Sequence, residues 1–324
     1  MKRDILIMKH GNVKRGFYLG DDSYELKDKG KRNAQRIGVW LDSSNLIPDY
    51  VVYSSANYAR VSAEKTCKAA GINLKQVKAK ECAYDASQEE ILSIIKATPK
   101  NIKRILVVGH NPALEEVLSL LSSKRLPKNK KGKVLSPATL IHFRIEREWS
   151  SITNKSADLI EIVYPKELPE MFPYPDANGS EKRIRPAYYY SQSGVIPYRI
   201  KNSQIEVLLI SSKTNKHWVI PKGIHEPGLS ARESARVEAY EEAGIEGDIL
   251  DKEVAQYQYI KWDATCTVSI FLMKVNVLLN EDHWLESNRQ RRWATISEAT
   301  DLIHNPELAS IVKLIPDYIG LNAA

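Results

Sequence analysis

The chain has 324 residues, of which 43% are hydrophobic and 27% charged, and its formal net charge is +7. This composition is typical of a globular protein and excludes a low-complexity chain, and the length suits two domains better than one core. Three widely separated cysteines exclude a disulfide framework and a cysteine-rich zinc site, and no apolar run is long enough to span a membrane. The first residues favour a strand over a signal peptide, so we expect a cytoplasmic protein.

The first half of the chain alternates predicted strands with predicted helices. Apolar strands are predicted at residues 4–8, 104–108 and 158–163. Helices are predicted at residues 30–41, 59–70, 87–97 and 112–121. This alternation is typical of an α/β domain with a mostly parallel sheet.

Two of these strands end in loops that contain a histidine. The first strand is followed by Lys9, His10 and Gly11, and the strand 104–108 is followed by the turn from Gly109 to Pro112. Because the carboxyl ends of the strands line the binding crevice of an open α/β sheet, we expect His10 and His110 to meet there. A lone loop histidine usually makes only a structural hydrogen bond, but the pair, with residues 53–55 and 60 between them, points to chemistry.

These segments resemble the histidine phosphatase superfamily, in particular its short phosphohistidine phosphatases. The matching pieces are Lys9-His10-Gly11 for the Arg-His-Gly motif, residues 54–60 for the Ser-Ser-Pro-x-x-Arg-Ala element, and Gly109 to Pro112 for the Gly-His-Asn-Pro turn. The resemblance implies a three-layer domain like phosphoglycerate mutase, which needs no cofactor. His10 would become phosphohistidine.

The resemblance also gives roles to the neighbouring residues. Lys9, Arg60 and His110 would hold the phosphoryl oxygens, and Asn111 would bind substrate. Lys9 keeps the positive charge of the family's arginine but loses its bidentate fork. The general acid is open: Asp85 is one choice, Glu81 is another, and a good leaving group needs none.

A loop after the helix 112–121 is rich in basic residues. These are Lys124, Arg125, Lys128, Lys130, Lys131 and Lys133. Such a run is usually solvated, and a nucleic-acid surface is the usual alternative; no aromatic residues interleave, so nucleic acid is disfavoured. A strand expected to begin near Val134 would return to the active edge of the sheet. The loop would then attract a polyanionic substrate over a Debye length of ~8 Å.

A proline-rich segment divides the chain. We predict a first domain at 1–165, a semi-extended linker at 166–187 and a second domain at 188–324. Tyr188, Tyr189 and Tyr190 then form an edge strand or a stacking surface, with at least one ring expected in the core.

The most informative stretch of the second half runs from Pro221 to Ile245. Ser230 and Glu233 form a capping box that starts a helix near Ala231, and Gly244 ends it with a positive φ. Spacings of three and four then place Glu238, Glu241 and Glu242 on one face. A solvated acidic face is the ordinary reading of such residues, but Mg²⁺ or Mn²⁺ would turn their repulsion into coordination, with a carbonyl of Gly223 as a further ligand.

This stretch resembles the Nudix box. Gly223, Glu238, Ala239, Glu241, Glu242, Gly244 and Ile245 fall in register, whereas Leu229 and Val237 stand where the family has Glu and Arg. Expected strands at 194–199, 206–210 and 267–277 fit the α+β Nudix sandwich. The tripeptide from Pro221 to Gly223 and the tail at 284–286, 291–293 and 297–299 are similar to the branch that cleaves diphosphoinositol and diadenosine polyphosphates.

The Nudix resemblance implies a site and a substrate class. Mg²⁺ or Mn²⁺ would bind Gly223, Glu238, Glu241 and Glu242, and Glu241 would also serve catalysis. Lys222 and Arg199 would bind a small phosphorylated substrate, a nucleotide or another polyanion. We therefore predict a bifunctional hydrolase of phosphoryl groups and pyrophosphates. The alternatives are a phospho-ligand sensor or a protein phosphohistidine phosphatase with one weak half, and the substrate and oligomeric state stay open.

Overall fold

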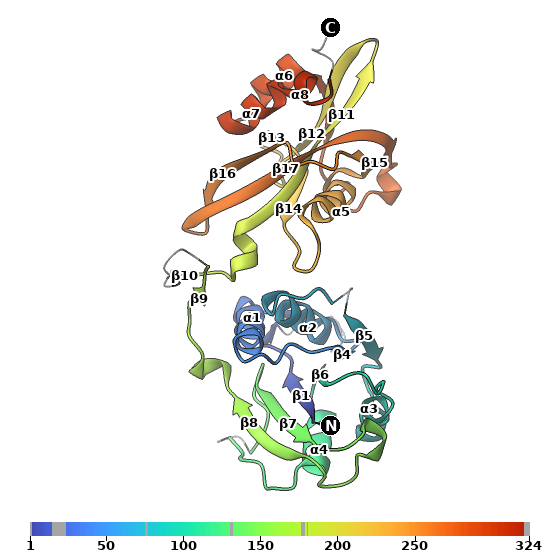
Figure 1. Ribbon diagram of the computed structural model, residues 1–324, viewed down its shortest axis with the longest axis vertical. Helices are drawn as coiled ribbons and strands as arrows, with labels where there is room; N and C mark the ends of the chain where they lie inside the picture. Colours follow the sequence, from blue (N-terminus) through green and yellow to red (C-terminus); the bar gives the residue numbers. More distant parts are fainter. Residues whose placement is uncertain are drawn as a thin grey trace. The chain divides into compact units, whose positions relative to one another are not determined.

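The structure is a computed structural model that describes residues 2–14, 24–74, 77–129, 132–175, 179 and 181–320 (Figure 1). The chain divides into two compact units, Met1–Lys182 and Arg183–Ala324. The division falls inside the predicted linker 166–187. That connecting stretch carries η3 (Pro165–Glu167) and the short strands β9 (Phe172–Pro173) and β10 (Lys182–Arg183).

The first unit is built on a six-stranded sheet with the order β5-β4-β6-β1-β7-β8. Its strands are β1 (Arg3–Lys9), β4 (Tyr50–Ser54), β5 (Lys78–Cys82), β6 (Arg104–Gly109), β7 (Leu140–Ile145) and β8 (Asp158–Val163). The first four run parallel to one another, and β7 and β8 are antiparallel to their neighbours. The predicted mostly parallel sheet is therefore confirmed.

Four helices cover the two faces of this sheet. They are α1 (Asp28–Ser43), α2 (Asn57–Ala69), α3 (Gln88–Lys96) and α4 (Ala113–Leu121), with a minor hairpin of β2 (Val13–Lys14) and β3 (Glu25–Leu26) and the turn η2 (Trp149–Ser151). Alternate residues of a strand point to opposite faces. Accordingly Ile5 and Ile7 pack with α3 and α4, while Leu6 and Met8 pack with α1 and α2. The result is the predicted three-layer domain.

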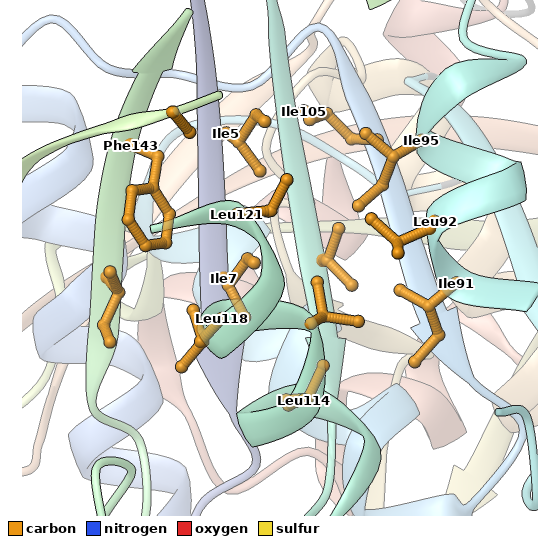
Figure 2. Close-up of a cluster of buried hydrophobic side chains, with 14 of the residues drawn as sticks. Ile5, Ile7, Ile91, Leu92, Ile95, Ile105, Leu114, Leu118, Leu121 and Phe143 are labelled. Carbon is orange, nitrogen blue, oxygen red and sulfur yellow. The ribbon is translucent and has the colours of Figure 1, made fainter. Parts of the chain in front are cut away.

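The α3–α4 layer is a dense apolar core. Figure 2 shows side chains of α3 and α4 packed over β1, β6 and β7, namely Ile91, Leu92, Ile95, Leu114, Leu118, Leu121, Ile5, Ile7, Ile105 and Phe143. All ten are at most 7% exposed. This core fixes the strand ends that carry the two histidine loops.

The strand expected near Val134 begins later, at Leu140. Val134 is buried without joining the ladder, because backbone groups around it bond to side chains: Leu135 N donates to Glu115 Oε1 at 3.1 Å, and Lys133 N donates to Asn129 Oδ1 at 3.2 Å. The chain nevertheless returns to the active edge. Ala138 N lies 3.0 Å from the carbonyl oxygens of both Lys9 and His10.

The second unit contains an eight-stranded mixed sheet. Its strands are β11 (Ser191–Lys201), β12 (Gln204–Ser211), β13 (Trp218–Val219), β14 (Lys222–Ile224), β15 (Ile245–Ile249), β16 (Ala255–Lys261), β17 (Ala264–Leu278) and β18 (Arg291–Thr295). The predicted strands 194–199, 206–210 and 267–277 lie within β11, β12 and β17. A parallel pairing of β11 with β17 forms its centre.

Helices cover both faces of this sheet as well. They are α5 (Ala231–Ala243), α6 (Ile296–Leu302), α7 (Pro306–Lys313) and α8 (Ile315–Tyr318), with 3₁₀ turns η4 (Ala187–Tyr190) and η5 (Glu281–His283). Val195 and Leu208 pack with α5, and Ile196 and Leu209 pack with α6 to α8. The tyrosine run is thus a 3₁₀ turn rather than an edge strand. Tyr190, 1% exposed, is the ring that joins the core.

Helix α5 begins and ends where the sequence predicts. Ser230 and Glu233 make the reciprocal capping box, and Gly244 follows the helix with φ 59°. A Cβ at Gly244 would also lie 2.7 Å from the Trp284 ring, so the position needs glycine for two reasons. The capping box thus sets the N-terminal end of the helix, and Gly244 packed against Trp284 sets its C-terminal end.

Candidate active sites

The ladder between β1 and β6 brings the two histidine loops together. Lys9 pairs with Gly109, and His10 N donates to the Gly109 carbonyl at 2.9 Å. The ring of Tyr58, from α2, lies between the histidines, with its centroid 4.3 Å from His10 and 6.1 Å from His110. The predicted meeting of His10 with His110 therefore occurs, and an unpredicted tyrosine accompanies them.

The hydrogen bond of His10 defines its tautomer. Its Nδ1 lies 2.6 Å from the Gly11 carbonyl oxygen, which only accepts, so Nδ1 carries the proton and Nε2 keeps a lone pair. Burial lowers the pKa of His10 to about 4, and the positive charges of Lys9 and His110 act in the same direction. His10 is therefore a neutral imidazole with a free Nε2 at physiological pH.

Lys9 lies beside two charged residues of other elements. Burial lowers the pKa of Lys9, Lys133 lowers it further, and Glu115 opposes both. Glu115 also accepts hydrogen bonds at Oε1 from Asn111 Nδ2 at 2.7 Å and from Leu135 N at 3.1 Å. Glu115 thus joins the Asn111 turn to the basic loop, a role whose sequence signal was the i, i+4 spacing from Asn111.

Three buried polar atoms at this edge have no hydrogen-bond partner among the described residues. They are His110 Nδ1, Asn111 Oδ1 and Thr139 Oγ1. Burying such groups unpaired is costly, so they are available to a polar ligand. Burial also lowers the pKa of His110, with Lys9 acting in the same direction.

Arg60, predicted to hold a phosphoryl oxygen, is paired with side chains of its own helix. Its guanidinium contacts Glu64 Oε1 at 2.5 Å and Asn57 Oδ1 at 3.0 Å. Residues two apart on a helix do not share a face, so Tyr58 facing His10 turns Arg60 away. Lys9 acts on the charge of His10, and Lys133 acts in turn on Lys9.

The proposed general acids are also displaced. Asp85 is exposed, while its neighbour Tyr84 stacks on His110 with ring centroids 4.8 Å apart. Glu81 is exposed on the edge strand β5. Among the described residues, neither carboxylate forms a hydrogen bond or ion pair with either histidine, and the Tyr84 ring is the group of this segment that contacts His110. Lys130 and Lys131 of the basic loop lie outside the described residues.

In the second unit, β14 places the acidic helix against a glycine. Ser193 pairs with Gly223 and Gly194 pairs with Lys222 along β11. A Cβ on Gly223 would lie 2.0 Å from Glu238 Oε1, so only glycine lets this carboxylate approach the loop backbone. Gly223 and Glu238 therefore adjoin, as the sequence predicted.

Glu242 is held by a buried arginine that the sequence did not single out. It accepts from Lys222 N at 3.0 Å and pairs with Arg289 NH2, and Arg289 also bonds Glu286 at 2.6 Å. The Arg289 residue is only 6% exposed. A buried arginine must be paired. Arg289 pairs with the carboxylates of Glu242 and Glu286, and this pairing holds Glu242 in position.

The acidic face of α5 is electrostatically strained. Burial raises the pKa of Glu238 to about 8, and Glu242, Glu241 and Glu226 add to this shift by repulsion. Burial also raises the pKa of Glu242. Among the described residues no three acidic, His or Cys side chains are gathered as a preformed metal centre. The donors are nevertheless all hard oxygens under mutual repulsion, which fits a divalent cation such as Mg²⁺ or Mn²⁺.

The ammonium group of Lys222 is hydrogen-bonded to two polar side chains. Nζ donates to Gln192 Oε1 at 3.1 Å and to Tyr259 OH at 3.2 Å, and Tyr259 donates to Gln192 at 2.7 Å. Burial lowers the pKa of Lys222 to about 8, with Lys261 acting in the same direction. Lys222 is therefore a half-buried cation next to the acidic helix.

Arg199 does not join this site, contrary to the sequence prediction. Its Nε contacts Glu206 Oε2 at 2.6 Å on the neighbouring strand, and its guanidinium lies 4.0 Å from the centroid of the Trp293 ring. Five residues of strand separate it from Gly194, roughly 16 Å at ~3.3 Å per residue. Arg199 instead ties β11 to β12 and β18.

Comparisons with known proteins match the second unit to a family. A NUDIX domain model matches residues 191–315. Nudix hydrolase 16, mitochondrial, from Arabidopsis thaliana is 31% identical over 132 residues, which cover 35% of this chain and 72% of that protein. The chain belongs to the Nudix family.

Two other relatives of this Nudix protein match a similar share of the chain. Nudix hydrolase 21, chloroplastic, from Arabidopsis thaliana is 36% identical over 129 residues, 38% of this chain and only 65% of that protein's length. The asymmetrical bis(5'-nucleosyl)-tetraphosphatase of Sus scrofa is 29% identical over 119 residues, 36% of this chain and 81% of its own. The predicted Nudix hydrolase domain is confirmed.

Solved structures resemble each unit of the Nudix protein. The protein histidine phosphatase SixA complexed with tungstate is 16% identical with a TM-score of 0.41, over 50% of this chain and 97% of that chain. C. elegans Ap4A hydrolase is 25% identical with a TM-score of 0.35, over 40% of this chain and 98% of that chain. Within the described residues, no helix has the length and apolar character needed to cross a bilayer.

Proposed function

We propose that the Nudix unit hydrolyses a pyrophosphate bond of a nucleoside polyphosphate or a similar polyanion, with bound Mg²⁺ or Mn²⁺. The observation that carries this proposal is Glu238, a half-buried carboxylate packed against Gly223 among further carboxylates, with its pKa raised to about 8. A divalent cation relieves such repulsion, and the neighbouring Lys222 offers a positive charge to a phosphate.

Each residue of this site has a distinct part in the proposed reaction. Gly223, Glu238, Glu241 and Glu242 would hold the metal, which supplies charge neutralisation and polarises a phosphoryl oxygen. Arg289 keeps Glu242 in place, and Lys222 orients an anionic oxygen from its seat between Gln192 and Tyr259. Glu241, at the same helix face, accepts the proton of the attacking water.

For the first unit we propose phosphoryl transfer to His10. The free Nε2 attacks phosphorus, the bond from phosphorus to the leaving oxygen breaks, and water then hydrolyses the phosphohistidine. Lys9 and His110 would hold the phosphoryl oxygens, together with the unpaired polar atoms of Asn111 and Thr139. A good leaving group departs without a general acid.

One observation supports a second candidate for the first unit. Tyr58 occupies the space beside His10, and Arg60 is paired with Glu64, so the site has lysines in place of arginines. Lysine binds phosphate as a point charge without a bidentate fork. A module that binds a phosphorylated ligand without turning it over would have this composition.

A phosphate-release screen with and without Mg²⁺ tests these proposals. Nucleoside triphosphates, diadenosine polyphosphates, diphosphoinositol polyphosphates and phosphohistidine are the substrates. Glu241→Gln should lower the metal-dependent rate by orders of magnitude, whereas the exposed Glu246→Gln should leave it unchanged. Equal rates in both variants would contradict the Nudix mechanism.

The phosphoenzyme is tested in the same full-length protein. A phosphorylated donor should give an acid-labile adduct in the presence of EDTA, and His10→Ala should abolish it while the metal-dependent activity remains. Phosphate binding without any adduct would favour the binding module over the phosphatase.

A further inference from the structure

The first unit has a basic cavity at the C-terminal end of α4. It has a volume of about 340 Å³ and lies where the loop after α4 folds back, with Lys124, Arg125, Lys128 and Lys155 among its lining residues. This volume is at the small end of the range for ligand pockets, roughly 300–1,000 Å³. Four cationic side chains therefore line one partly open cavity.

The four cations of this cavity have no counter-charge in the part of the chain that the structure describes. None forms an ion pair with a carboxylate among the described residues. The nearest acidic groups along α4, Glu115 and Glu116, line an adjoining cavity that shares Ser119 and Lys155. Glu115 is already bound to Asn111 and Leu135. The cavity thus presents net positive charge, which attracts anions.

Three consecutive residues connect this cavity to the histidine site. Val134 lines the cavity. Lys133, which precedes Val134, lowers the pKa of Lys9 by charge repulsion. Leu135, which follows Val134, donates its N–H to Glu115, and Glu115 also accepts a hydrogen bond from Asn111. The chain next to the cavity wall is therefore linked to Lys9 by charge and to Asn111 by hydrogen bonds.

The lining of the cavity distinguishes between two polyanions. It contains no aromatic residue among Ser119, Ser122, Ser123, Leu126 and Val134, so it offers no surface on which a nucleobase could stack. A single phosphate monoester carries at most about two negative charges, fewer than the cations present. The chemistry therefore favours several linked phosphates over a nucleic acid or a lone phosphate.

We propose that this cavity binds a chain of phosphates. Its consequence for catalysis rests on the phosphatase role proposed above: the distal phosphates lie among Lys124, Arg125, Lys128 and Lys155, and Lys133 leads toward the terminal phosphate at His10. Binding itself does not depend on catalysis. The cavity holds the chain by charge, so its affinity falls as salt concentration rises.

Calorimetric titration with inorganic tripolyphosphate tests the proposal. The full-length His10→Ala protein is used with EDTA, so that neither turnover nor metal at the Nudix site contributes. Adding Lys128→Ala and Lys155→Ala should weaken binding by about tenfold or more. The matched control is Lys78→Ala with Lys100→Ala, two exposed lysines of the same unit outside the cavity, which should bind as the parent does.

Three other outcomes overturn the proposal, and a fourth separates it from the phosphatase role. Equal losses of affinity in the two double variants would mean that tripolyphosphate binding depends only on the overall charge of the protein. A lack of binding in low salt would mean that the cavity holds no phosphate chain, and tighter binding of a short single-stranded oligonucleotide would mean that it is a nucleic-acid site. Retained binding without any His10 adduct in the parent protein would uphold the cavity and refute the phosphatase.

Discussion

At the residue scale, desolvation of the His10 ring sets its protonation state. Burial holds the pKa of His10 near 4, below the ordinary value of 6.5, so the ring keeps its lone pair as the pH falls between these values. Phosphoenzyme formation should therefore continue undiminished at about pH 5, where an ordinary histidine is mostly protonated. Quenched labelling with a phosphorylated donor across this range measures it.

The same shift sets a direction for stability. Below pH 6.5 the His10 ring of the unfolded chain takes up a proton, whereas the ring of the folded protein stays neutral until about pH 4. Protonation therefore stabilises the unfolded state, and the first unit should lose stability from about pH 6.5 down to about pH 4. His10→Phe should reduce this loss. In the labelling experiment, a rate of phosphoenzyme formation that halves near pH 6.5 would contradict the neutral His10 ring.

Gly223 is the second residue whose local geometry makes a prediction. Gly223→Ala would place a Cβ 2.0 Å from Glu238 Oε1, and the carboxylate must swing away because the strand backbone is fixed. The fold should persist, but the Mg²⁺ concentration for half-maximal hydrolysis should rise by about tenfold or more. A metal titration of activity measures this, with the melting temperature of the metal-free protein as the control; an unchanged titration would separate Gly223 from metal binding.

At the element scale, α2 presents one face to the histidine site and another to solvent. Arg60→Ala should remove only a partly exposed pair with Glu64, which contributes up to ~1 kcal/mol, and should leave phosphoenzyme formation unchanged. Tyr58→Ala should alter the rate of adduct formation, because this ring lies against His10. Rapid-quench labelling of both variants compares them. An Arg60 effect larger than the Tyr58 effect would restore the arginine to the site.

Elements defined by local rules were predictable from the sequence. The capping box and Gly244 set both ends of α5, and the apolar runs of β1 and β6 set the meeting of His10 with His110. Side chains whose direction depends on distant contacts were not. Arg199 is turned by Glu206 and Trp293, residues that pair with it only after β11, β12 and β18 assemble.

The site partners supplied by other elements escaped the sequence for the same reason. Arg289 reaches Glu242 across 47 positions, and Tyr58 reaches His10 across 48. Nothing in the residues around Arg289 indicates this pairing. Glu115 is the exception, because its i, i+4 spacing from Asn111 is local and visible in the sequence.

At the scale of the whole molecule, each unit has its own apolar core. Leu118 is fully buried between α4 and the first sheet, and Leu272 is fully buried between β17 and the helices α6 to α8. Replacing either with Ala should cost ~2–5 kcal/mol. Calorimetry of the full chain should show Leu118→Ala lowering one transition and Leu272→Ala lowering another. Both variants shifting a single shared transition would mean that the units unfold together.

The hydrogen bond from His10 Nδ1 to the Gly11 carbonyl also fixes the regiochemistry of any adduct. Nδ1 is occupied by its proton and its acceptor at 2.6 Å, which leaves Nε2 as the nitrogen that forms a covalent bond. The adduct should therefore be the tele isomer of phosphohistidine rather than the pros isomer. Isomer-selective antibodies or ³¹P NMR distinguish the two, so the chemical identity of the trapped species reports directly on the orientation of one imidazole ring.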